Sequence, residues 1–83
     1  MSQKHKLKAW PEPFWSVVQG RKRHEFRKND RDFRVGDTLA LHEWDPNTER
    51  YSGHVVKLYV TYASYGPDFG IPEGYVVMSV RRI

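Results

Sequence analysis

The stretch Gly20-Arg21-Lys22-Arg23-His24-Glu25-Phe26-Arg27 joins a predicted helix to a predicted strand. Upstream of it, Phe14, Val17 and Val18 have the i, i+3, i+4 spacing of one helical face, which predicts a helix over residues 12–19. Gly20 suits the position just after a helix, because glycine adopts a left-handed conformation without a Cβ clash. Downstream, side chains alternate between two faces, which predicts a strand over residues 22–28.

The rest of the chain extends this pattern in both directions. Further strands are predicted over residues 5–9, 37–44, 51–65 and 75–83, with turns at 29–32 and 45–49 and a Gly- and Pro-rich loop at 66–74. Four consecutive strands after one helix cannot form a doubly wound sheet in 83 residues. The sequence therefore predicts a mostly β (α+β) fold of order β-α-β-β-β-β, a small, mostly antiparallel barrel of five or six strands with the helix covering one end.

Residues 1–83 are expected to form a single domain, with residues 1–4 as a flexible start. A chain this short has a thin core. The side chains expected to be buried are Phe14, Val17, Val18, Leu39, Leu41, Val60 and Val77 or Val76.

Composition excludes several classes of protein. The chain has no cysteine, which rules out a disulfide scaffold, a zinc–thiolate or iron–sulfur site and a thiol nucleophile. The four histidines are not spaced as metal ligands, so no metal and no other cofactor is expected. No apolar run is long enough to span a membrane, and no signal peptide is recognisable. We expect a cytoplasmic protein that does not bind membranes.

Charge is distributed unevenly. Residues 1–34 contain ten Lys or Arg and four Asp or Glu, whereas residues 35–83 contain four basic and six acidic residues. A basic half in a small domain with a high isoelectric point is typical of nucleic-acid binders. Solubility alone accounts for such a charge equally well.

The octapeptide at residues 20–27 fits the pattern G-x-K-x-x-E-x-R and resembles the core motif of ASCH domains, which are compact β-barrels of the PUA-like superfamily. The resemblance covers residues 5–83 and is greatest to the small stand-alone ASCH-like proteins of bacteria and phages. It implies an RNA-binding fold in which the motif forms a ligand cleft. The resemblance thereby assigns a ligand-site role to Lys22, Glu25 and Arg27, with Gly20 as the structural glycine.

The chemistry of the motif can also be considered without the family. Glu25 and Arg27 share a strand face, so they can pair, or Glu25 can hold Arg27 toward a cleft beside Lys22. Such a cleft suits an anionic or base-like ligand. The alternative is a salt-bridged strand on a solvated surface.

Three residues outside the motif extend the candidate site. Trp10 could stack on a base, and Lys8 lies close to it in sequence. Arg31, in the turn after the motif strand, is the expected phosphate contact of that turn. Packing is the simpler role for Trp10, and the turn could be purely structural. The predicted nucleic-acid-binding set is Lys22, Glu25, Arg27, Arg31, Trp10 and Lys8.

Three functions remain open. The first is an RNA- or single-strand-binding module. The second is an amidohydrolase acting on an acylated or otherwise modified nucleoside, for which the resemblance implies a catalytic Lys22; Glu25 stands where those enzymes have a threonine, and Glu73 is only a loose substitute for their glutamate. The third is a protein-interaction domain of a phage or mobile element. A closed pocket joining Lys22, Glu25 and one more polar group favours the enzyme, whereas an open cleft flanked by basic surface favours binding.

Overall fold

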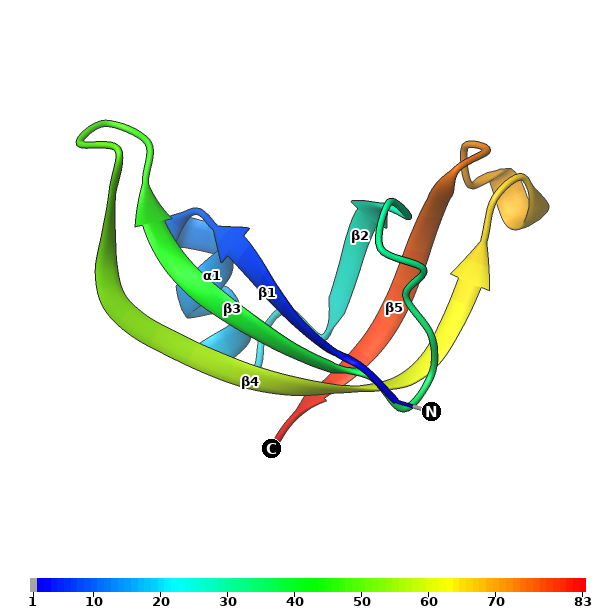
Figure 1. Ribbon diagram of the computed structural model, residues 1–83, viewed down its shortest axis with the longest axis horizontal. Coiled ribbons are helices and arrows are strands. Elements are labelled where there is room, and N and C mark those ends of the chain that lie inside the picture. Colours follow the sequence, from blue (N-terminus) through cyan, green and yellow to red (C-terminus); the bar gives the residue numbers. More distant parts are fainter. Residues whose placement is uncertain (1) are drawn as a thin grey trace.

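A computed structural model of the protein describes residues 2–83. Its elements follow in the order β1 (Lys4–Ala9), α1 (Pro11–Val18), β2 (His24–Lys28), β3 (Thr38–Asp45), β4 (Arg50–Tyr65), a short 3-10 helix η1 (Asp68–Gly70) and β5 (Tyr75–Arg82). The five strands form one sheet in the order β1-β3-β4-β5-β2 (Figure 1). Strands β1 and β3 are parallel, and all other neighbours are antiparallel.

The sheet curls into a half-barrel and does not close. Within residues 2–83, β1 pairs only with β3 and β2 only with β5, so these two strands are the edges of the sheet. Figure 1 shows the curl, with the long strand β4 bent through it. The predicted β-rich, barrel-like fold with one helix is confirmed at this level. The five strands form only a half-barrel whose edge strands do not pair, and η1 is an addition to the predicted loop.

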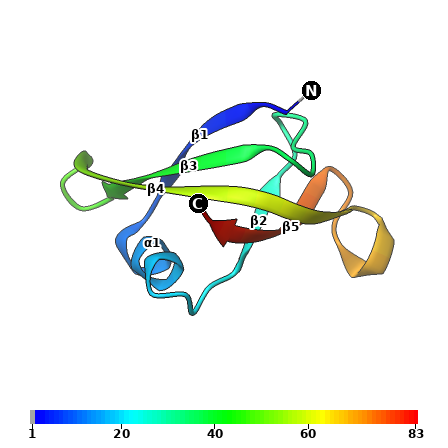
Figure 2. The same ribbon diagram turned by 90° about the horizontal axis from the view of Figure 1, so that it is seen from below.

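Helix α1 packs against β3 and covers one face of the sheet, as Figure 2 shows. The apolar core lies on this face, where it joins the helix to all the strands except β2. Of the predicted core, Val18 is only half-buried, although it packs against the core, and of the two alternatives Val77 and Val76 it is Val76 that is buried. The core residues are Leu7, Ala9, Phe14, Val17, Phe33, Leu39, Leu41, Val56, Leu58, Val60, Val76, Met78 and Val80.

The end of α1 explains why β2 begins later than the sequence predicts. Both Arg21 and Lys22 donate their backbone N–H groups to the carbonyl of Ser16, at 2.9 and 3.1 Å. Gly20 has a φ of +78°, the left-handed conformation expected just after a helix. The chain is therefore still turning at Lys22, and the extended conformation starts only at His24. This leaves the Lys22 side chain outside the alternation of β2.

A buried polar contact fixes the start of the chain. Asp37 is 1% exposed and accepts hydrogen bonds from the backbone N–H groups of Gln3 and Arg34. Its Oδ2 also lies 2.8 Å from Nε2 of His5. Strand β1 begins at Lys4, and the carbonyl of Gln3 accepts a hydrogen bond from the backbone N–H of Thr38. Met1 lies outside the described residues.

Candidate nucleic-acid interface

Glu25 is the centre of the candidate site. It points to the core side of β2 and is 5% exposed. Its Oε2 accepts a hydrogen bond from Lys22 Nζ at 2.5 Å, and its Oε1 accepts one from Arg27 Nε at 2.8 Å. Lys22 also donates to the carbonyl of His24 at 2.6 Å. Because each carboxylate oxygen binds one cation, Glu25 fixes the positions of both.

Two arginines connect the edges of the open sheet. Arg27 donates from Nη2 to the carbonyl of Lys8 at 3.1 Å, and Arg31 donates from Nη1 to the carbonyl of Lys6 at 2.8 Å. An edge strand presents backbone carbonyls that no neighbouring strand satisfies. The guanidinium groups of Arg27 and Arg31 satisfy two of these carbonyls on β1.

Two clefts lie along this junction. The first has a volume of about 330 Å³ and is lined by Lys8, Ala9, Trp10, Pro13, Lys22, Glu25, Phe26, Arg27 and Leu41. The second has a volume of about 390 Å³ and is lined by Leu7, Lys8, Phe26, Arg27, Lys28, Asp30, Arg31 and Phe33. Lys8, Phe26 and Arg27 line both, so they separate the two clefts. We call the first the motif cleft.

The structure brings most of the predicted site residues together. Lys8, Trp10, Lys22, Glu25 and Arg27 all line the motif cleft. Arg31 lies in the adjoining second cleft. Gly20 ends α1 and lines, with Lys22, a third cleft between the helix and β5. Residues from β1, from the start of α1 and from β2 therefore meet at one place, which sequence proximity alone could not establish.

Phe26 belongs to the site, although the sequence did not predict it there. Its side chain is 51% exposed, lines both clefts and stacks on the ring of Tyr75, with centroids 5.4 Å apart and an interplanar angle of 23°. The sequence does contain a signal, because Phe26 is an aromatic residue inside a charged motif. The alternation of the strand predicted only that Phe26 and Glu25 lie on opposite faces.

A second polar cluster lies between α1, β3 and β4, away from these clefts. Oε1 of Glu43 accepts a hydrogen bond from Ser52 Oγ at 2.6 Å and lies 3.2 Å from Nδ1 of His54, while Oε2 accepts one from Trp15 Nε1 at 2.7 Å. The hydrogen bond from Ser52 lowers the pKa of Glu43; burial opposes this, and His54 and Trp15 add to the lowering. Ser52 and Glu43 both contact the same nitrogen of His54, so the histidine does not relay between them. The cluster attaches the helix to the sheet.

Residues 2–83 contain no candidate metal site and no candidate membrane-spanning helix. No group of three or more His, Asp or Glu side chains is placed to hold a metal ion. Within the same residues, no helix has both the length and the apolar character needed to cross a membrane.

Comparison with known proteins gives a phage relative and a family. Over 44 residues the chain is 50% identical to a protein of Escherichia phage P2 described as "Uncharacterized 12.9 kDa protein in GpA 3'region". That match covers 53% of this chain and 40% of the phage protein, so the similarity spans less than half of the relative's length. A family model matches residues 4–80, which include β1 to β4, most of β5 and all the residues that line the two clefts. The chain therefore belongs to the family described as Domain of unknown function (DUF3850).

Proposed function

We propose that this protein is an RNA-binding module of the ASCH, PUA-like type, and that the motif cleft is its binding site. The observation that carries the proposal is the meeting of Lys8, Lys22 and Arg27 with the exposed ring of Trp10 in one open cleft. RNA readers commonly stack unpaired bases on aromatic side chains and neutralise phosphates with Lys and Arg. The cytoplasm is the proposed place of action, which fits a chain without cysteine.

The hydrogen bonds of the cleft indicate which donors are available to a ligand. An ammonium group has three donors. Lys22 uses one on Glu25 and one on the carbonyl of His24, which leaves one for a ligand. Arg27 is held at Nε and Nη2, so the rest of its guanidinium is available in a fixed orientation. We assign phosphate or base-edge contacts to these donors and stacking to Trp10, which is 57% exposed.

An amidohydrolase is less well supported by this geometry. A general base must accept a proton from the reacting group. Lys22 already donates to a carboxylate, and Glu25 is occupied by two cations. Among the described residues lining the motif cleft, no further hydroxyl, carboxylate or imidazole accompanies them. The open, basic cleft matches the criterion for binding and not the closed pocket expected of the enzyme.

The test is fluorescence anisotropy with a labelled single-stranded RNA and variants of the cleft. Trp10→Ala should weaken binding about 5- to 150-fold, because a base–aromatic stack contributes about 1–3 kcal/mol. Its control is Phe69→Ala, which truncates a ring that is 86% exposed and lies in η1, away from the clefts. Lys22→Gln should weaken binding about tenfold or more, since a charged contact contributes about 1.5–3 kcal/mol.

The control for Lys22→Gln is Arg50→Gln, which makes the same change of charge at the exposed start of β4. If Arg50→Gln reduces affinity as much as Lys22→Gln does, binding depends only on net charge; if Phe69→Ala reduces it as much as Trp10→Ala does, stacking is not specific to the cleft. Wild-type affinity in both Trp10→Ala and Lys22→Gln would contradict the motif cleft as the site.

A further inference from the structure

The two faces of the sheet differ sharply in charge. The core side chains of β1 alternate with Lys4, Lys6 and Lys8, and the same alternation continues across the paired strands. We call the face that these lysines occupy the outer face. The strands contain three acidic residues, and all three lie at core-side positions: Glu25 and Glu43, which are buried, and Asp45, two residues after Glu43. The outer face of the strands therefore carries no carboxylate.

The same face carries cations and aromatic rings together. The pairing register of the strands shows which residues share a face with the lysines of β1. The cations of this face, all exposed, are Lys4, Lys6, Lys8, Lys28, Lys57 and Arg81. Its aromatic residues are Phe26, Trp44, Tyr51, Tyr59, Tyr62 and Tyr75. Within residues 2–83, every cation–π pair lies here: Lys8 Nζ is 4.0 Å from the ring centroid of Trp44, Lys6 Nζ 5.6 Å from that of Tyr51, and Arg81 Cζ 4.9 Å from that of Tyr59.

No carboxylate neutralises these cations in the described part of the chain. The ion pairs there involve Lys22, Arg27, Arg34, His5 and His54, and none involves a cation of the outer face. An aromatic ring attracts a cation without cancelling its charge. His42, which lies among Lys6, Lys8 and Tyr51 on this face, reports the result: burial lowers its pKa, and the positive charge of Lys6 lowers it further. The face is electropositive as a whole.

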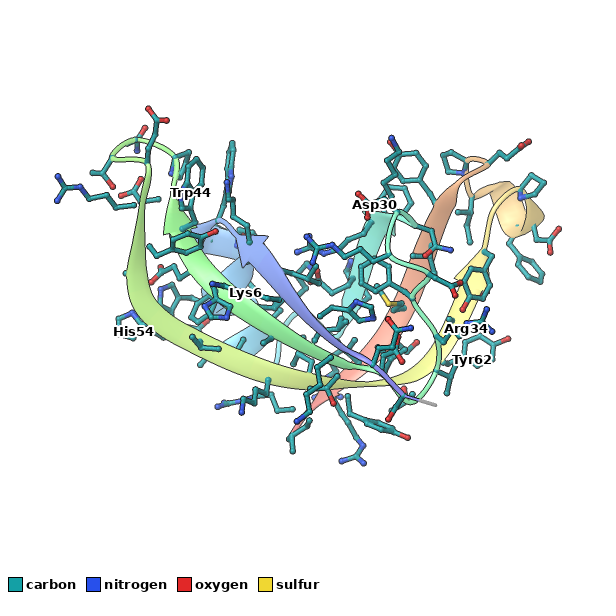
Figure 3. The ribbon with its side chains drawn as sticks, viewed as in Figure 1. Lys6, Asp30, Arg34, Trp44, His54 and Tyr62 are labelled. Atoms are coloured by element: carbon teal, nitrogen blue, oxygen red, sulfur yellow. The ribbon has the colours of Figure 1, made fainter. Side chains whose placement is uncertain are left out.

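The outer face is continuous with the motif cleft. Lys8 lines the cleft, and its ammonium lies over Trp44 on the outer face. From there, Lys6 and Tyr51 lead across β1, β3 and β4 toward Lys57 and Tyr59. Figure 3 shows Lys6 beside β1 and Trp44 at the end of β3, and Figure 1 shows α1 behind these two strands in the same orientation. A bound polymer that leaves the motif cleft past Lys8 would contact these side chains next.

We propose that the outer face of β1, β3 and β4 binds the backbone and unpaired bases of a nucleic-acid single strand that continues out of the motif cleft. The proposal rests on the proposed function for the identity of the ligand. Uncompensated cations along a surface favour a polyanion through counterion release. Interleaved rings add stacking, which only unpaired bases can use, and this favours a single strand over a duplex or an anionic membrane.

The test compares two ligand lengths and two salt concentrations. The probes are an RNA trinucleotide, which is short enough to be held at the motif cleft, and a single strand of about 16 nucleotides, the upper range of site sizes for small single-strand-binding folds. The variant is Lys6→Gln/Lys57→Gln. Its control is Arg34→Gln/Arg50→Gln, which removes the same charge from exposed positions outside the outer face.

For the longer strand, the face variant should lose about tenfold in affinity at low salt, and the slope of log K against log salt should fall by about 1.4, that is about 0.7 for each lost phosphate contact. Trinucleotide binding should be unchanged. An unchanged slope with the longer strand would overturn the proposal, as would an equal loss in the control. Equal loss of affinity for duplex RNA or for phosphatidylserine vesicles would assign the face to those partners instead.

The design separates this proposal from the motif cleft. If Trp10→Ala leaves trinucleotide binding intact while the face variant still lowers the slope, the cleft assignment fails and the outer face stands. If Trp10→Ala abolishes binding and the face variant changes nothing, only the outer face is rejected.

Discussion

Arg27 on one edge strand of the sheet donates a hydrogen bond to the backbone carbonyl of Lys8 on the other edge strand, 3.1 Å away. Arg31 makes the corresponding contact with the carbonyl of Lys6. In a closed barrel, backbone N–H groups would occupy these carbonyls. Here side chains take their place, which keeps the edges together while leaving clefts between them. The binding site we propose exists because the sheet is left open.

Removing one of these contacts should loosen the junction. Arg31→Gln should lower the free energy of unfolding by about 0.5–1.5 kcal/mol, the usual contribution of one hydrogen bond. For a domain of this size, each kcal/mol corresponds to a drop in the thermal midpoint of about 4–8 °C. Thermal unfolding followed by circular dichroism measures it. Arg50→Gln, which makes no such contact in the described structure, should leave the midpoint unchanged, and equal midpoints for the two variants would contradict the bridging role.

Among Lys22, Glu25 and Arg27, removing the two positive charges should lower the stability of the fold more than removing the negative charge. The sequence by itself predicts that Lys22→Ala/Arg27→Ala reduces RNA binding more than tenfold with little change in thermal midpoint. Because Glu25 is buried, we expect the double variant also to lose stability. The double variant leaves a buried carboxylate without a partner, which costs about 3–5 kcal/mol. Urea denaturation measures this loss directly.

Glu25→Gln should be milder in the same measurement. It leaves two cations whose side chains are 23% and 26% exposed and can be hydrated. Stability should fall by less than in the double variant, and RNA binding should change modestly or tighten, because one negative charge has left the cleft. A larger loss of stability for Glu25→Gln than for Lys22→Ala/Arg27→Ala would contradict this account.

Asp37 should make stability depend on pH at the acidic end. Burial raises the pKa of Asp37, but hydrogen bonds from Gln3, His5 and Arg34 outweigh it, and the pKa in the folded state is lowered. The carboxylate therefore stabilises the fold above the pKa of an unfolded Asp, and this stabilisation is lost as pH falls through the lowered folded value. Denaturation at a series of acidic pH values should show this decline in the wild type. Asp37→Asn should be less stable near neutrality and should lack that part of the decline.

His42 offers a direct measure of the field of the outer face. Its pKa lies below the ordinary histidine value because of burial and, second, because of Lys6. Lys6→Gln should raise the pKa of His42 only part of the way back, since burial remains. An NMR titration of the imidazole resonances measures the shift. Arg50→Gln should not move it, and an unshifted pKa in Lys6→Gln would show that Lys6 does not act on His42.

The sequence by itself determined the local structure of this protein. The i, i+3, i+4 spacing around Phe14 and the glycine at position 20 predicted α1 to within a residue at each end. Alternation predicted the strands, and the motif identified Lys22, Glu25 and Arg27 as neighbours. These features depend on periodicity and on backbone conformation, which residues close in sequence control.

Only the tertiary structure decided which distant residues meet and which groups are buried. The curl of the open sheet brings its two edge strands together and so places Lys8 and Trp10 beside β2, although both precede the motif by ten residues or more. The open sheet, the buried Glu25 and Asp37 and the carboxylate-free outer face follow from strand order and register. Pairing partners are set by packing over the whole core, and a one-residue change of register exchanges the two faces of a strand, so no local pattern could specify them.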